Sequence, residues 1–207
     1  DLMKAFMDLY QNNPDYQLLL RANTHMMYLE SDEIRWLANS SNNIILHWKN
    51  EGQNDLVSYL NNSHAFIYPS RADWFGMCPF EALATGMPVI ATDSNGYYEF
   101  IKDMITPIGS YKVDIKPGEH PYFKGQWNEP DQRSLREGML RVANNYETFA
   151  GWGYENAMKI REQFSWKNVT EKYLIPFLDK VWKKHFATNI NRKVIKLSDL
   201  IKEHARK

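Results

Sequence analysis

The chain has 207 residues, 43% hydrophobic and 24% charged, which is enough for one α/β domain with a sizeable core. Its 25 basic and 25 acidic residues give a formal net charge of zero, so overall charge offers no argument for a nucleic-acid partner. The single cysteine, Cys78, excludes an internal disulfide and a cysteine-based metal cluster. No apolar run approaches the length of about 18 residues that a membrane-spanning helix needs.

Hydrophobic periodicity predicts helices that alternate with short buried strands. The expected helices cover residues 2–12, 31–38, 53–61, 78–85 and 97–102, and the expected strands cover 16–21, 43–48, 65–68, 88–92 and 105–108. This alternation is typical of a Rossmann-like parallel sheet with helices on both faces, which binds ligands at the carboxyl ends of its strands. Residues 107–130 combine glycine, proline and charge without a period, which predicts mostly loop.

Residues 63–101 carry the chemistry: a buried strand, a loop with Asp73, a short helix with Glu81, then a second buried strand. The first N–H groups of a helix lack intrahelical partners and carry partial positive charge, so residues 76–78 could donate to a phosphate or a sugar oxygen. Glu81 could accept hydrogen bonds from ribose hydroxyls while Asp73 meets a second polyol. The alternative is that Glu81 is an acid favoured only by the helix dipole and Asp73 a solvated loop residue.

The same residues resemble the donor-site signature of the retaining glycosyltransferases of the GT-B fold (glycosyltransferase family 4, group 1). That signature has proline-serine after a strand, an acid, phenylalanine-glycine, a second acid eight residues after the first, then alanine, glycine and proline. The matching residues here are Pro69, Ser70, Asp73, Phe75, Gly76, Glu81, Ala82, Gly86 and Pro88. The resemblance implies the C-terminal, nucleotide-sugar-binding half of a GT-B fold.

The resemblance also implies roles for individual residues. Glu81 takes the place of the acid that holds the ribose hydroxyls. Asp73 takes the place of the acid that contacts the transferred sugar. These two acids are therefore the catalytic candidates. The implied donor-binding residues are Ser70, Phe75, Gly76, Met77, Cys78, Asn95 and Gly96. Family members normally have glutamate where this chain has Asp73, whose shorter side chain reaches less far. The implied donor is a nucleoside diphosphate sugar, with neither metal nor other cofactor.

The expected organisation is a nucleotide-sugar-binding domain with closing helices at residues 1–184 and a basic amphipathic tail at 185–207. In the resembled family an acceptor-binding domain, and a strand and loop with two basic residues, precede the first helix. Their absence here leads us to expect one half of a cytoplasmic two-domain hexosyltransferase, inactive by itself. The tail fits either a peripheral contact with the inner membrane face or docking on a neighbouring domain, and docking is favoured.

Other assignments stay open at this point. The rival functions are a degenerate sugar-nucleotide-binding or scaffold module, a GT-B-fold epimerase and a membrane adaptor acting through the tail. Arg71 could supply a cation to the diphosphate, although a salt bridge to Asp73 is preferred. For His47 and Trp48 a core or surface role is favoured over contact with a nucleobase. Cys78 is expected to be a small packing residue rather than a nucleophile.

Overall fold

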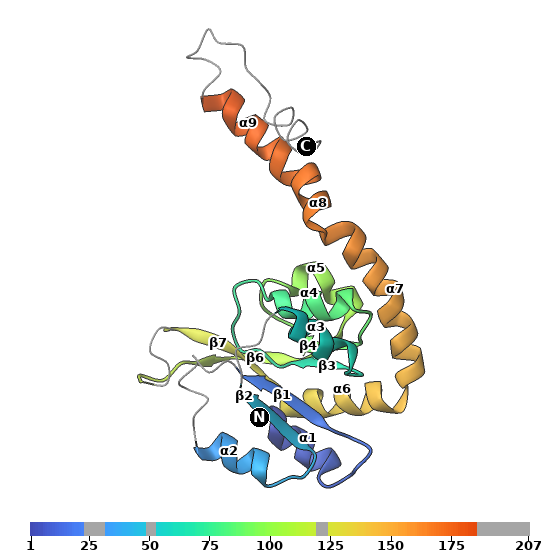
Figure 1. The fold of residues 1–207 in the computed structure, drawn as a ribbon. Coiled ribbons are helices and arrows are strands. Elements are labelled where there is room, and N and C mark those ends of the chain that lie inside the picture. Colours follow the sequence, from blue (N-terminus) through green and yellow to red (C-terminus); the bar gives the residue numbers. More distant parts are fainter. Residues whose placement is uncertain (23–31, 49–52, 119–123, 186–207) are drawn as a thin grey trace. The chain divides into compact units, whose positions relative to one another are not determined.

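The computed structural model describes residues 1–22, 32–48, 53–118 and 124–185 (Figure 1). They belong to two compact units, residues 1–157 and 158–207. The described helices are α1 (Leu2–Tyr10), α2 (Asp32–Asn39), α3 (Gln53–Asn61), α4 (Met77–Ala84), α5 (Tyr98–Ile101), η2 (Lys102–Met104), α6 (Gln132–Asn144), α7 (Tyr146–Phe164), α8 (Trp166–Val169), η3 (Thr170–Leu174) and α9 (Ile175–His185). The described strands are β1 (Leu18–Ala22), β2 (Ile44–Trp48), β3 (Phe66–Tyr68), β4 (Val89–Thr92), β5 (Thr106–Ile108), β6 (Ser110–Asp114) and β7 (Gln126–Pro130).

The first five strands are all in parallel pairs. β1 pairs with β2, with Leu18 opposite Ile44, and a second sheet has the order β3-β4-β5, with Phe66 opposite Val89. The predicted α/β class with parallel strands and intervening helices is therefore confirmed. Within the described ranges, backbone hydrogen bonds divide these strands into two sheets instead of the single sheet expected.

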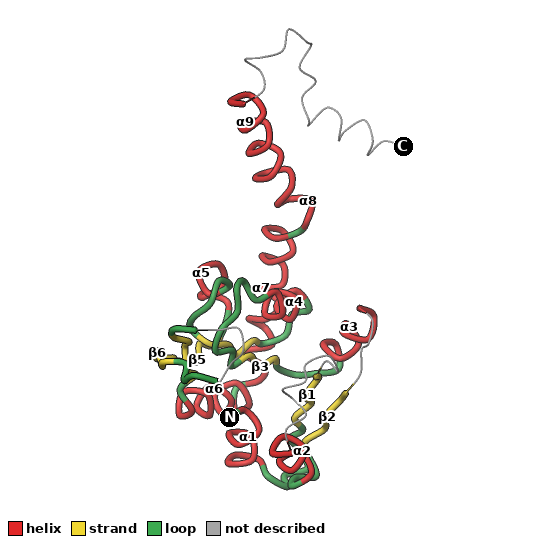
Figure 2. Tube along the Cα trace, turned by 90° about the vertical axis from the view of Figure 1, so that its left-hand side faces the viewer, coloured by secondary structure: helices red, strands yellow, loops and turns green. Residues whose placement is uncertain are grey.

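The strands lie between two helical layers in the unit of residues 1–157. Figures 1 and 2 show α1, α2 and α6 on one side and α3, α4 and α5 on the other. The core against the first layer includes Phe6, Leu37 and Leu135 from the helices and Leu18 and Ile90 from both sheets. Because one apolar cluster spans both sheets, the carboxyl ends of their strands belong to the same compact body.

The prediction of mostly loop for residues 107–130 is wrong in part. The structure has an antiparallel pair of strands there, with Ser110 of β6 opposite Pro130 of β7 and Asp114 opposite Gln126. Long-range pairing decides the structure of β6, since local composition alone, with Lys112 and Asp114 on a strand exposed at most of its positions, resembles a loop. The pair matters for the site because Trp127 and Glu129 of β7 contact the loop after β3.

The described part of the second unit, residues 158–185, consists of helical segments. It takes in the C-terminal part of α7 together with α8, η3 and α9. In the described part of the chain, no helix is both long and apolar enough to cross a membrane. The predicted tail at 185–207 lies outside the described residues apart from His185, so the expected boundary at 184 and the tail's role stay predictions.

Helix α4 is held at its C-terminal end by the start of α7. Gly86 follows α4 with a φ of +90° and ends the helix. Gly153 of α7 packs directly on the backbone of Gly86. A Cβ on Gly153 would overlap the Gly86 carbonyl oxygen and lie 3.1 Å from its carbonyl carbon. Only a residue without a side chain lets the two segments approach this closely.

We therefore predict that Gly153→Ala lowers the free energy of unfolding by about 1 to 3 kcal/mol, because backbone has to move to admit the methyl group. The matched control is Gly151→Ala in the same helix, where an added Cβ meets nothing within 4 Å. It should raise the free energy of unfolding by about 0.5 to 1 kcal/mol through helix propensity. Urea denaturation measures both, and equal effects of the two substitutions would contradict the packing described.

Candidate functional site

The loop between β3 and α4 carries the first predicted acid, Asp73. Its carboxylate is held at both oxygens: the Tyr68 hydroxyl donates to Oδ2, and the Phe75 N–H donates to Oδ1 over 3.3 Å. The Asp73 N–H in turn donates to Oδ1 of Asn95 over 3.0 Å. The acid is therefore part of an ordered turn, and its carboxylate has a defined direction.

A second loop, between β4 and α5, packs against the first. Asn95 has a φ of +74° and uses both ends of its amide, accepting from Asp73 and donating from Nδ2 to the Ser70 carbonyl over 3.3 Å. Gly96 lies against the backbone of the first loop, since a Cβ there would overlap the Trp74 carbonyl and lie 2.9 Å from Phe75 Cα. The structure thus brings the predicted residues Ser70, Asp73, Asn95 and Gly96 together.

Helix α4 begins at the end of this loop. Gly76 is its N-cap, with a φ of +80° that favours glycine, and the N–H groups of the first turn have no carbonyl within the helix to bind. Pro79, the third helical residue, has no N–H, so Met77 and Cys78 supply the first-turn N–H groups closest to the loop. Partial positive charge at this end suits a phosphate.

One face of α4 is open to solvent and holds the second acid. Met77, Cys78 and Glu81 are exposed, whereas the helix buries Pro79, Phe80, Ala82 and Leu83. Partial burial raises the pKa of the Cys78 thiol, and the carboxylates of Glu81 and then Asp73 raise it further. Both acids therefore lie near Cys78 at the start of the helix, and the thiol stays protonated at neutral pH, which disfavours its use as a nucleophile.

The aromatic residue of the signature, Phe75, packs against two helices at the surface and stays 38% exposed. The Phe75 ring stacks on Phe80 of α4 with centroids 5.1 Å apart, and its centroid lies 5.6 Å from that of Phe100 in α5. The ring ties the loop to the helix, and the contribution of Phe75 to donor binding stays a prediction.

The preferred salt bridge between Arg71 and Asp73 is wrong. The guanidinium pairs with Glu129 of β7 over 2.7 Å and with Asp1 over 2.8 Å, and its carbon lies 4.9 Å from the centre of the Trp127 ring. Asn128 of β7 also donates its N–H to the Arg71 carbonyl over 3.0 Å. These contacts tie Arg71, and with it the loop, to β7, where Trp127 is buried.

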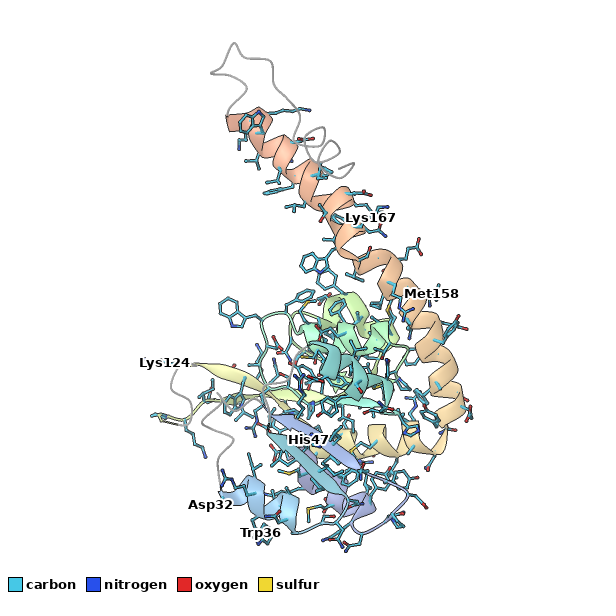
Figure 3. All side chains as sticks on the ribbon, viewed as in Figure 1. Asp32, Trp36, His47, Lys124, Met158 and Lys167 are labelled. Carbon is cyan, nitrogen blue, oxygen red and sulfur yellow. The ribbon has the colours of Figure 1, made fainter. Side chains whose placement is uncertain are left out.

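His47 lies at the carboxyl end of β2 (Figure 3), opposite Arg21 of β1 in the parallel register. Its Nδ1 is 2.9 Å from the Tyr59 hydroxyl of α3, and the two rings meet edge to face. This supports the favoured core or surface role. The side chain of Trp48 lies outside the described residues.

Two residues that contact the candidate site, Tyr68 and Tyr97, are not predicted from the sequence. Tyr68 belongs to an apolar run and is expected to be core, yet its hydroxyl reaches Asp73. Tyr97 is fully buried between the two loops and donates its hydroxyl to the Thr92 carbonyl over 2.8 Å. The only signal in the sequence is that each tyrosine has a hydroxyl and lies within a few residues of an aspartate.

Two further observations bear on ligands. A cavity of about 320 Å³ lies between α2 and β2, lined by Arg35, Ala38, Asn39, Ile44 and Leu46. It is remote in sequence from the loops described above, and the predicted site is instead an open rim. Across the described ranges, no group of three or more histidine, cysteine or acidic side chains is placed to hold a metal ion.

A rim of helix N–H groups and acids at the carboxyl ends of parallel strands is the place where open α/β proteins bind ligands. The sequence matches the family Glycosyl transferases group 1 over residues 1–109, more than half of the chain, so the chain belongs to that family. It is 28% identical over 127 residues to a D-inositol 3-phosphate glycosyltransferase of Paenarthrobacter aurescens, covering 59% of this chain. It is also 28% identical over 113 residues to an uncharacterized glycosyltransferase of Methanocaldococcus jannaschii, covering 55% of this chain.

Solved structures agree on the fold. A sucrose-phosphate synthase from Thermosynechococcus elongatus superimposes with a TM-score of 0.64 at 18% sequence identity and covers 91% of this chain. A glycosyltransferase from Rickettsia africae superimposes with a TM-score of 0.64 at 17% sequence identity and covers 88% of this chain. The GT-B-like fold is thereby confirmed. The chain spans 28% and 27% of the two curated relatives' lengths and 42% and 43% of the two structures.

The contact between Gly76 and Tyr97 yields a stability prediction. A Cβ on Gly76 would overlap the Tyr97 ring, whereas Gly125 has a similar φ of +95° with nothing within 4 Å. Alanine at either position has a backbone strain of roughly 1 to 2 kcal/mol. We predict that Gly76→Ala lowers the free energy of unfolding by about 1 to 3 kcal/mol more than Gly125→Ala, because of the added overlap. If chemical denaturation gave the same loss of unfolding free energy for both substitutions, the Tyr97 ring would be able to move away from the added methyl group without cost, and the prediction would fail.

Tyr97 also yields a pH prediction. Burial raises its pKa from 10.0 to about 12, although hydrogen bonds with Asn95 and Thr92 oppose the shift. Between these values the unfolded chain loses a proton that the folded chain keeps, so the free energy of unfolding falls as pH rises, by about 2 to 3 kcal/mol from this residue.

Tyr97→Phe should therefore flatten the dependence of the unfolding free energy on pH between pH 10 and 12. Tyr111→Phe, at an exposed position on β6, is the control and should leave that slope unchanged. A slope that is the same in all three proteins would contradict the assignment.

Proposed function

We propose that this chain is the donor-binding half of a retaining GT-B glycosyltransferase of family 4, which transfers a hexose from a nucleoside diphosphate sugar. The observation that carries the proposal is the convergence of the first N–H groups of α4, Glu81 on its exposed face and Asp73 in the preceding loop. Donors suited to a diphosphate and acceptors suited to hydroxyls thus lie at one rim. A nucleotide sugar presents both chemistries.

The roles follow from charge and reach. The Gly76–Cys78 main chain donates to the phosphates, so negative charge on the departing diphosphate meets the positive end of α4. Glu81, one turn along the exposed face, accepts from the ribose hydroxyls, and Asp73 accepts from the sugar. Positioning and charge stabilisation are the contributions that this half of the protein makes to transfer.

We further propose that an acceptor domain outside these residues completes the catalytic cleft, so that this chain alone does not turn over. The unequal lengths of the chain and its relatives support this. The proposed cytoplasmic location and the peripheral contact of the 185–207 tail remain separate hypotheses.

A catalytically degenerate sugar-nucleotide-binding module is the second candidate. The observation in its favour is that both oxygens of Asp73 already accept hydrogen bonds from Tyr68 and Phe75. Such a module binds the nucleotide sugar as well, so the two candidates differ in turnover and not in binding. A hexose-transfer assay on the full-length protein separates them.

The test of the site is calorimetric titration of the chain with UDP, GDP and ADP. We predict that Glu81→Ala raises the Kd of the diphosphate that binds best by about 10- to 100-fold, since a carboxylate bound to hydroxyls is lost. The control is Glu99→Ala, an exposed acid on α5, which should leave the Kd within about twofold. If a diphosphate binds tightly and Glu81→Ala leaves its Kd unchanged, Glu81 is not part of the site. If none of UDP, GDP and ADP binds, the proposal is overturned.

A further inference from the structure

The carboxylate of Asp73 is directed by a partner on the preceding strand. Tyr68, the last residue of β3, donates its hydroxyl to Oδ2, while the turn itself donates the Phe75 N–H to Oδ1. An aspartate that only shaped this turn would need the second bond alone, since side-chain acceptance from the N–H two residues on is the ordinary aspartate turn. The bond to Tyr68 adds an orientation that the turn does not require.

Tyr68 itself is held firmly. Its ring stacks near Phe66 with centroids 5.8 Å apart and meets the buried Tyr97 at 67°, with centroids 5.9 Å apart. Its carbonyl accepts from Thr92 Oγ1 over 3.4 Å. Packing on the strand and against the second loop therefore fixes where the hydroxyl lies.

The protonation state of Tyr68 fixes which partner donates in its hydrogen bond with Asp73. Burial raises the pKa of Tyr68 well above its usual value of 10.0, and the bond to Asp73 and its charge raise it further. The phenol is then protonated at neutral pH and its one proton is used on Asp73. A hydrogen bond with the Ser70 side chain acts in the opposite direction on this pKa and occupies the phenolic oxygen, so the acceptors that remain for a ligand are the other lone pairs of the Asp73 carboxylate.

A site of acceptors with negative charge favours a ligand that brings hydroxyl donors and disfavours an anion. At this rim the phosphates belong near the N–H groups of α4, so the hydroxyl-rich part of the ligand is the one that meets Asp73. The short side chain of aspartate suits this arrangement, since its carboxylate lies within reach of Tyr68.

We propose that Tyr68 is a positioning residue that holds the Asp73 carboxylate as an acceptor for a hydroxyl of a neutral sugar, and thereby sets the affinity for the sugar half of the donor. The inference rests on the proposed function and adds to it a residue and a division of labour. Tyr68 and Asp73 bind the sugar, whereas α4 and Glu81 bind the nucleoside diphosphate.

The experiment compares each nucleoside diphosphate with its hexose conjugate on the 207-residue chain by calorimetry. The probes are UDP with UDP-glucose, GDP with GDP-mannose and ADP with ADP-glucose, and the best-binding pair is carried forward. Tyr68→Phe keeps the ring and its packing but removes the hydroxyl. We expect it to raise the Kd of the conjugate about fivefold or more, as for one hydrogen bond, with the Kd of the diphosphate within about twofold.

A double-mutant cycle makes the test specific to the pair. Asp73→Asn should cause the same selective loss, and the double variant should lose little more than Asp73→Asn alone, since the two residues act as a unit. Tyr111→Phe is the matched control, because it removes a hydroxyl from an exposed tyrosine of β6 and should change neither Kd. Thermal melting of each variant checks folding.

The outcomes are distinct. If Tyr68→Phe weakens the diphosphate as much as the conjugate, Tyr68 supports the whole loop and the positioning role is overturned. If it weakens neither, or if the two substitutions add, the role is likewise overturned while the proposed function stands. If the unchanged chain binds no diphosphate, the proposed function itself falls and takes the positioning role with it.

Discussion

The close contact between the two loops that follow β3 and β4 is the constraint on which the site depends. Gly96 lets the second loop meet the backbone of the first, and Asn95 joins them by bonds to Asp73 and Ser70. Because both loops follow neighbouring parallel strands, their separation is set by the sheet. Without that contact, Asp73 and the start of α4 would have no fixed relation.

The contact is reinforced on both flanks. On one side β7 braces the loop through Arg71, whose guanidinium bridges Glu129 and Asp1 and lies over Trp127. On the other side Phe75 packs on Phe80 and so ties the loop to the first turns of α4. A site fixed in this way spends little binding energy on ordering itself when a ligand arrives, which is the basis of preorganised recognition.

Sequence predicts this molecule well where the pattern is local and less well where distant segments meet. The alternation of helices and strands follows from periodicity, and contacts between the two loops bring Ser70, Asp73, Asn95 and Gly96 together. The β6–β7 pair joins residues 12 to 20 positions apart, and Glu129 lies 58 positions from Arg71, so both depend on contacts for which a single sequence has no local signal. Tyr68 shows the same limit, since an apolar run predicts its burial but not the acid that its hydroxyl meets.

The central claim is that a nucleoside diphosphate binds at the N-terminus of α4, and amide NMR of the labelled chain tests it most directly. On titration with the diphosphate, the account predicts that the largest shifts fall on the N–H groups of Met77 and Cys78 and on residues 93–97. Shifts confined to the cavity under α2, at Arg35 and Asn39, would contradict it.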